Sequence, residues 1–182
     1  MLTFWRLGYE GASIVDLTGA MGITPQSLYA AFGSKAALYT EALTRYQTED
    51  GGFTAQALVE EPTAICAFTR VLMESAKVFT RSDRPNGCMI STATLACADE
   101  HRPLANVVAS LREDTLRAFE ARIVRGVSQG DINAETDPAA LARFVGAVIQ
   151  GMSVQAQDGA SETDLLGVAR LAIAEVARQG PA

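Results

Sequence analysis

Apolar residues recur every three or four positions along most of the chain, a spacing typical of amphipathic helices. The pattern predicts long helices over residues 34–49, 62–80, 103–129, 137–157 and from 161 onward. A shorter apolar stretch, residues 88–97, predicts a further helix, and the polar residues 81–87 before it predict a loop. Many alanines and few runs of β-branched residues also favour helix. We therefore expect an all-α protein.

The most distinctive local pattern begins at residue 13. Ser13 can cap a helix, and Asp16 three residues later completes a capping box. Ile14 and Leu17 then lie on one apolar face. Gly22 stands where the end of this helix needs a residue that tolerates a positive φ. These residues predict a short helix that ends in a tight turn.

A second short helix follows at once. Thr24 is a good N-cap, and Pro25 falls at the first helical position, where its missing N–H is not needed. Leu28 and Phe32 form the inner face of this helix, and Gly33 ends it. The residues left to face outward are small or polar: Gln26, Ser27, Ala30 and Ala31, with Tyr29 at the flank.

Together these elements form a helix-turn-helix unit, with a third helix starting at Ser34. The second helix has only about two turns, and its small polar surface suits a position against base edges in the major groove. The alternative is a helical hairpin within an ordinary bundle. We interpret the unit as a DNA-binding one.

At these positions the sequence resembles the TetR (tetracycline-repressor-like) family of bacterial transcription regulators. The matching residues are Phe4-Trp5, Gly8-Tyr9, Ser13-Ile14, Leu17, Met21-Gly22-Ile23, Leu28-Tyr29, Phe32, Ser34-Lys35 and Leu38-Tyr39. They cover about the first quarter of the chain, and the remainder matches in its helical layout. The resemblance implies a homodimer that binds palindromic double-stranded operator DNA and responds to a small molecule.

The resemblance also implies roles for single residues in the first part of the chain. Thr24, Gln26 and Ser27 would lie at or near base edges. Phosphates would be contacted by Tyr29 and Lys35, and by Ser13 through its hydroxyl or backbone N–H. The expected DNA-binding set is Ser13, Thr24, Pro25, Gln26, Ser27, Tyr29 and Lys35.

We expect two domains. Residues 1–47, which include the linking helix, would bind DNA, and residues 48–182 would bind the effector and form the dimer. The last two helices are apolar around much of their circumference, so other helices must cover them. A second subunit can do so in a two-fold four-helix bundle, and burial within one chain is the alternative. The expected interface residues are Leu141, Val145, Val148, Met152, Leu165, Val168, Leu171 and Ala172.

The resemblance implies an effector pocket inside the second domain, between the helices of residues 62–80, 88–97 and 103–129. The candidate lining residues are Met73, Met89, Thr92, Leu95, Leu116, Phe119, Phe144 and Gln150. Residues of this kind are more often ordinary core than ligand contacts. Their side chains suit a largely apolar molecule with one or two polar groups. Arg112 is expected among the outward charges of its helix, and His101, the sole histidine, is expected as a loop or capping residue.

Composition narrows the functional classes. The chain of 182 residues carries a net charge of −6, which argues against general affinity for nucleic acids or membranes. It shows neither an apolar run of about 20 residues nor a signal-peptide pattern, so we expect a cytoplasmic protein. The three cysteines lack zinc-type spacing and are expected as buried reduced thiols, with a redox switch as the alternative. We expect no metal and no cofactor.

The first fifty residues hold three basic side chains and five acidic ones, which is unusual for a DNA-binding unit. We expect the native start to lie upstream of Met1. The main functional hypothesis is a ligand-responsive transcriptional repressor, released from operator DNA by a small molecule. The alternative is an interaction protein that keeps the regulator fold with weakened or lost DNA binding. A small helical enzyme is a minor alternative, because the sequence offers no set of nucleophile, base and orienting group.

Overall fold

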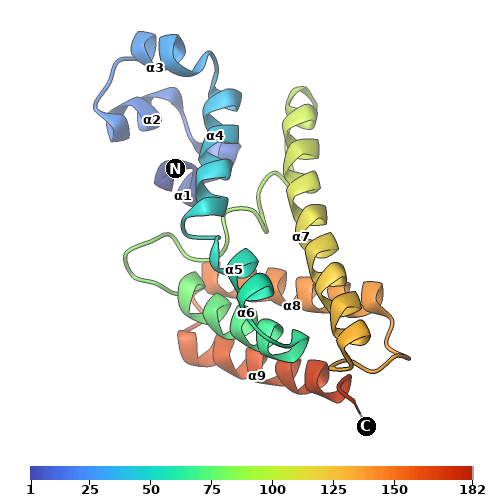
Figure 1. Cartoon of the computed structure of the whole chain (residues 1–182). Helices are drawn as coiled ribbons and strands as arrows, with labels where there is room; N and C mark the ends of the chain where they lie inside the picture. The colour runs from blue at the N-terminus through green and yellow to red at the C-terminus, as the bar shows by residue number, and fades with distance from the viewer. Residues whose placement is uncertain (182) are drawn as a thin grey trace.

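The computed structural model describes residues 1–181, which fold into nine α-helices and one short 3₁₀-helix, without a β-strand among them (Figure 1). The first four helices are α1 (Leu2–Gly11), α2 (Ile14–Met21), α3 (Pro25–Phe32) and α4 (Lys35–Thr48). The others are α5 (Phe53–Glu60), α6 (Ala64–Phe79), η1 (Asp99–His101), α7 (Arg102–Gln129), α8 (Pro138–Gln157) and α9 (Glu162–Arg178). The predicted all-α class is confirmed.

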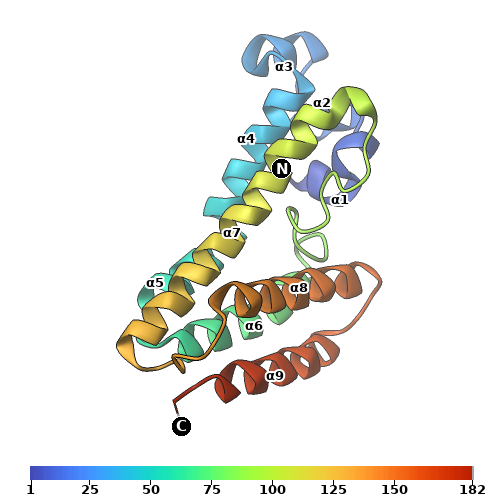
Figure 2. The same cartoon turned by 90° about the vertical axis from the view of Figure 1, so that its right-hand side faces the viewer.

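Helices α1–α4 form a small head, and α5–α9 form a larger body (Figures 1 and 2). Helix α3 lies at the outer tip of the head, and α4 runs from α3 toward α5. In the body, α6 packs against α5, α8 and α9, and α7 packs against α8. Within residues 1–181, no helix combines the length and apolarity needed to cross a lipid bilayer.

The capping signals in the head are confirmed. The Ser13 side chain accepts a hydrogen bond from the N–H of Asp16, and the Asp16 carboxylate accepts one from the N–H of Ser13. Gly22 has φ 65° and ends α2 in the left-handed region. The Thr24 hydroxyl accepts the N–H of Ser27 at 3.1 Å and caps α3. Local hydrogen bonds thus define the turn between α2 and α3.

The core of the head is aromatic. The Phe4 ring meets Tyr39 edge-on at 4.9 Å, and Trp5 meets Tyr46 edge-on at 4.8 Å, so α1 packs on α4. Leu28 is fully buried and anchors α3 to this core. Edge-to-face pairs at such distances stabilise packing beyond the area they bury. The packed core of the head therefore supports α3.

The prediction of a helix over residues 88–97 is wrong: this segment is a series of turns. Nη1 of Arg112 donates to the carbonyl oxygens of Ile90 and Ala93, at 3.1 and 3.0 Å. Thr94 has φ 50°, which no α-helix contains. In an α-helix these carbonyl groups would accept hydrogen bonds from the helix's own N–H groups, whereas here they accept from Arg112 on a distant helix. An apolar run of this length does not reveal such a partner.

One further helix and one helix boundary also differ from the prediction. Helix α5, Phe53–Glu60, starts just after Gly51-Gly52, where the sequence pattern predicts no helix. Helix α6 starts at Ala64 instead of Pro62, because the Thr63 side chain accepts the N–H of Cys66 and caps the helix there.

Candidate DNA-binding head and body cavity

Helix α3 presents an exposed polar surface at the tip of the head (Figure 1). Gln26 and Ser27 are exposed, and Tyr29 is 47% exposed. Leu28 faces the opposite way into the head core. A short helix held by one buried face, with free polar groups on the other, has the form needed to enter a major groove.

Several of the predicted DNA-binding groups also hold the helices together. Thr24 and Pro25 are exposed at the start of α3, and the Thr24 hydroxyl lies 3.0 Å from the Ser27 hydroxyl. The N–H and hydroxyl of Ser13 both donate to the Asp16 carboxylate, at 2.9 and 2.6 Å. These two bonds keep the pKa of Asp16 below its ordinary value. The donors of Ser13 are thus occupied, and its phosphate contact stays a prediction.

Lys35 lies in the first turn of α4, half-buried, with its ammonium 4.5 Å from the centre of the Tyr9 ring. In the sequence it is the sole basic residue between Arg6 and Arg45. The aromatic face attracts the ammonium and limits its freedom. Tyr9 thereby restrains the cation of Lys35, whose phosphate contact stays a prediction.

The head is also bonded to the body through His101. Its Nδ1 lies 2.7 Å from Oε1 of Glu10, and its ring meets Tyr9 edge-on at 4.9 Å. The hydrogen bond to His101 is the largest cause that lowers the pKa of Glu10, and the N–H of Ala98 adds to it. His101 lies in η1, so it connects the start of α7 to α1.

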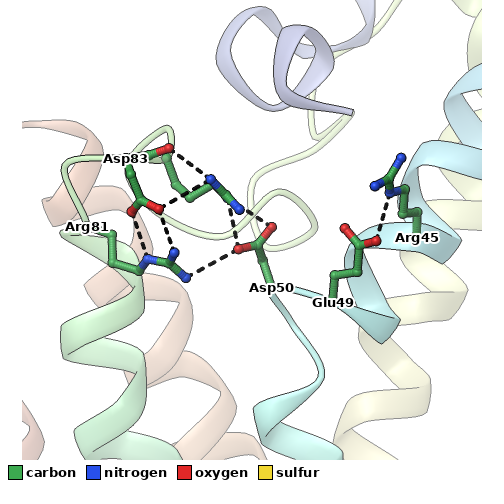
Figure 3. Close-up of polar contacts among 6 residues, drawn as sticks. Arg45, Glu49, Asp50, Arg81 and Asp83 are labelled. Carbon is green, nitrogen blue, oxygen red and sulfur yellow. Dashed lines mark hydrogen bonds and ion pairs between the residues drawn. The ribbon is translucent and has the colours of Figure 1, made fainter.

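A second connection lies where α4 passes into α5 (Figure 3). The Asp50 side chain is only 5% exposed and faces two guanidinium groups from the loop after α6. Nε of Arg84 lies 3.1 Å from Oδ1 of Asp50, and Nη1 of Arg81 lies 3.4 Å from the same oxygen. Asp83 pairs with Arg81 at 2.7 Å. This cluster ties the end of α4 to the body.

The body contains a cavity of about 320 Å³ between α4, α5, α7, α8 and the segment 88–91. Of the predicted lining residues, Leu116, Phe119 and Gln150 border it. A second hollow of about 760 Å³ lies between α1 and residues 85–96. Three other candidates line that second hollow: Met89, Thr92 and Leu95. The predicted pocket residues are therefore divided between two spaces.

The last two pocket candidates lie elsewhere. Met73 packs against the core of the body, and Phe144 is 38% exposed on α8. Several polar residues that line the smaller cavity were not among the candidates, Tyr46 and Arg112 among them. Arg112 is half-buried and not outward as predicted, because residues 88–97 fold over it. The sequence did not reveal that Arg112 would be half-buried, because an arginine in an amphipathic helix is ordinarily expected on its exposed face.

The apolar faces of α8 and α9 are largely covered within the chain. Five of the predicted interface residues are buried in the core of the body: Leu141, Val145, Met152, Leu165 and Ala172. Val148 and Val168 are partly buried, and Leu171 is 77% exposed. A partner subunit can contact only exposed or partly exposed residues. The dimer contact therefore stays a prediction, and Leu171 is the most exposed of the predicted interface residues.

The cysteines differ in exposure. All three are free thiols, as expected, but Cys66 is exposed on α6 and not buried. Cys88 and Cys97 are partly buried, and Cys88 borders both hollows. Cys66 is exposed because it follows the Thr63 cap on the outward side of the first turn of α6.

Comparisons with known proteins agree with this architecture. The profile described as "Tetracyclin repressor-like, C-terminal domain" matches residues 64–170. The HTH-type transcriptional repressor ComR of Escherichia coli (strain K12) is 32% identical over 173 residues, which are 93% of this chain and 81% of ComR. The repressor BdcR of the same organism is 29% identical over 170 residues, again 93% of this chain and 81% of BdcR.

Solved structures extend the likeness to the whole fold. A cysteine mutant of the TetR family regulator CifR, complexed with 26-bp double-strand operator DNA, is 39% identical with a TM-score of 0.92. The match covers 95% of this chain and 91% of CifR. A TetR transcriptional regulator from Rhodococcus sp. RHA1 is 41% identical with a TM-score of 0.67, over 98% and 94% of the two chains. The helix-turn-helix head, the helical body and these matches together show that the chain belongs to the TetR family of transcriptional regulators.

Proposed function

We propose that the chain is a ligand-responsive repressor that binds palindromic operator DNA as a homodimer and leaves it when a small molecule occupies the body cavity. The exposed polar face of α3 is the observation that carries this proposal. Two heads would place two such helices in major grooves with a separation of about 34–36 Å. The operator DNA bound by CifR supports this reading.

The proposal divides the chain into a DNA-binding domain, residues 1–47, and an effector-binding and dimerisation domain, residues 48–182. One hydrophobic cluster lies wholly within residues 48–182, and the other consists mainly of residues from 1–47, joined by Met89, Leu104 and Val108, which supports this division. The protein would act in the cytoplasm, where its operator lies. We assign it no catalytic activity, because its relatives are transcriptional regulators.

Effector release would follow from a population shift. A ligand that binds better to one arrangement of the heads than to another moves the equilibrium toward that arrangement. Tyr46 supports this route, because it belongs to α4, lines the cavity and packs on Trp5 of α1. A molecule in the cavity therefore touches the helix that carries the head.

A regulator-fold interaction protein is the second candidate, and the charge of the head favours it. The first fifty residues contain three basic and five acidic side chains. Attraction between basic side chains and phosphates supplies much of the affinity for DNA, so this composition disfavours DNA binding. The two candidates differ in one property. The repressor selects a specific DNA sequence, and the interaction protein selects none.

The deciding experiment is selection from a pool of randomised duplexes with the full chain, followed by binding measurements on the selected DNA. We expect a palindromic sequence to emerge. Gln26→Ala should change the preferred base at one position of each half-site, at a cost of about 1–3 kcal/mol for the original base. Gln155→Ala, an exposed glutamine on α8, is the matched control and should leave the preference unchanged.

Lys35→Ala tests the phosphate contact separately. It should weaken binding to all duplexes by a similar factor and lower the slope of log affinity against log salt by about one. Lys77→Ala, an exposed lysine on α6, should change neither quantity. Failure to enrich any sequence would refute the repressor. Equal effects of Lys35→Ala and Gln26→Ala on base preference would refute the division between phosphate and base contacts.

A further inference from the structure

The body cavity contains a cation without a counter-ion. Arg112 lines the cavity and is half-buried, and no carboxylate among residues 1–181 forms an ion pair with it. Its hydrogen bonds to the carbonyls of Ile90 and Ala93 use Nη1 alone. The edge formed by Nε and Nη2 has no hydrogen-bond partner among the described residues. Burial lowers the pKa of Arg112, so the charge is held at a cost in solvation.

A guanidinium edge of this kind matches one group closely. Nε–H and Nη2–H point in parallel and can donate two hydrogen bonds to the two oxygens of a carboxylate. Charge-assisted pairs strengthen as their surroundings become less polar, and Arg112 is half-buried. The bonds of Nη1 hold the guanidinium in place, so its free edge is preorganised for a ligand.

A second polar group in the cavity lacks a partner. Tyr46 is 1% exposed and lines the cavity, and its hydroxyl is buried without a hydrogen-bond partner among the described residues. Burial, with a smaller effect of the Cys88 thiol, raises the pKa of this hydroxyl well above its ordinary value. It therefore stays protonated, and a ligand that displaced the atoms covering it would meet a hydrogen-bond donor. A buried donor without an acceptor carries a cost in free energy, which a ligand that supplies an acceptor would remove.

The remaining walls are mostly apolar and neutral. Phe53, Leu58, Phe79 and Phe119 border the cavity. The one acidic residue on the wall, Asp114, is paired with Arg117. A volume of about 320 Å³ holds a small organic molecule, with room for a short apolar tail beside its polar end.

We propose that the effector is a small monocarboxylate with an apolar tail, whose two oxygens bind the Nε/Nη2 edge of Arg112 and accept the Tyr46 hydroxyl. Its role as an effector rests on the proposed function, whereas its binding to the cavity does not. The same two residues connect it to the head: Arg112 holds the segment that buries Met89 in the head core, and Tyr46 packs on Trp5.

The test measures binding to the full-length protein without DNA, by titration calorimetry. The probes are straight-chain carboxylates of about six to eight carbons, each with its primary amide and its primary amine, chosen to fit a cavity of this size. We expect the carboxylate to bind at least about tenfold more tightly than the amide, since a charged hydrogen-bonded pair is replaced by a neutral one. The amine should show no binding.

Variants then assign the site. Arg112→Gln should remove the preference for carboxylate over amide. Arg102→Gln, an exposed arginine at the start of α7 that does not line the cavity, is the control and should keep it. Tyr46→Phe removes a hydroxyl without a partner, so it should leave the fold intact and weaken carboxylate binding about threefold to tenfold. Because Arg112→Gln also loses the bonds to Ile90 and Ala93, Tyr46→Phe and the wild-type comparison decide the matter if that variant does not fold.

Equal affinity for carboxylate and amide in the wild-type protein, or no binding of any carboxylate in the series, would overturn the inference. DNA binding is scored separately with the selected operator. Operator binding without a carboxylate preference refutes only this inference. A carboxylate preference without any DNA binding refutes the repressor and leaves the site standing.

Discussion

The turn between α2 and α3 depends on the backbone of one residue. Gly22 has φ 65°, and the N–H of Ile23 donates to the carbonyl of Thr18 at 3.1 Å, which closes the end of α2. A side chain at Gly22 would meet no neighbouring atom, so only the backbone conformation restricts the residue type. L-residues adopt this region at a cost of about 1 kcal/mol. The angle at which α3 leaves the head is set here.

Gly22→Ala should therefore lower the free energy of unfolding by about 1 kcal/mol. Gly19→Ala is the matched control, because Gly19 lies inside α2 with open space around it. In a helix interior alanine is better than glycine, so this change should stabilise by about 0.5–1 kcal/mol. Urea unfolding at one fixed protein concentration measures both. Loss of stability in both variants would show that space, and not φ, is the restriction.

At the scale of elements, the connection between α4 and the body is electrostatic as well as apolar. Asp50 lies two residues after the end of α4 and shares its carboxylate between Arg81 and Arg84 (Figure 3). Its side chain is 5% exposed, so solvent screens it little. Glu49 next to it pairs with Arg45 in a pair that is 47% and 66% exposed. Of these adjacent residues, Asp50 thus makes two ion pairs through a buried carboxylate, and Glu49 makes one exposed pair.

Asp50→Asn should lower the free energy of unfolding by about 2 kcal/mol, because two partly covered guanidinium groups lose their shared carboxylate. Glu49→Gln should cost less than about 0.5 kcal/mol, since exposed pairs contribute little. Urea unfolding in low and high salt separates the two. Similar losses for the two variants would mean that the shelter of Asp50 does not matter.

For the whole molecule, the question is which surface a second subunit covers. Leu171 on α9 and Val59 on α5 are 77% and 75% exposed, so each presents an apolar side chain to solvent. Only Leu171 belongs to the two C-terminal helices that we propose as the interface. An apolar side chain at a dimer contact is buried on association, and a charge in its place opposes that burial.

Leu171→Asp should make the protein monomeric, and Val59→Asp, its matched control, should leave it dimeric. Size-exclusion chromatography with light scattering gives the mass of each variant. Both substitutions are at exposed sites, so neither should alter the fold of the single chain. A dimer that survives Leu171→Asp would move the interface away from this part of α9.

Sequence alone determined the all-α class, the helix-turn-helix unit and its caps. Ser13 and Thr24 bond to groups three residues away, and Gly22 acts through its own backbone. Such interactions are complete within one turn of chain, so spacing and residue type reveal them. The exposed polar side of α3 follows from the same periodicity.

Only the tertiary structure decided what lies inside the body. Residues 88–97 are turns because Arg112, 22 positions from Ile90, supplies donors to their carbonyls. The same contact places Arg112 in the wall of the cavity. Packing within the chain leaves Leu171 as an exposed apolar residue of α9. An amphipathic pattern indicates that one face of a helix is covered, but it does not identify the residues that cover it. The partner of a buried group comes from a distant part of the chain. The sequence around the buried group therefore does not reveal its partner, and only the folded structure brings the two together.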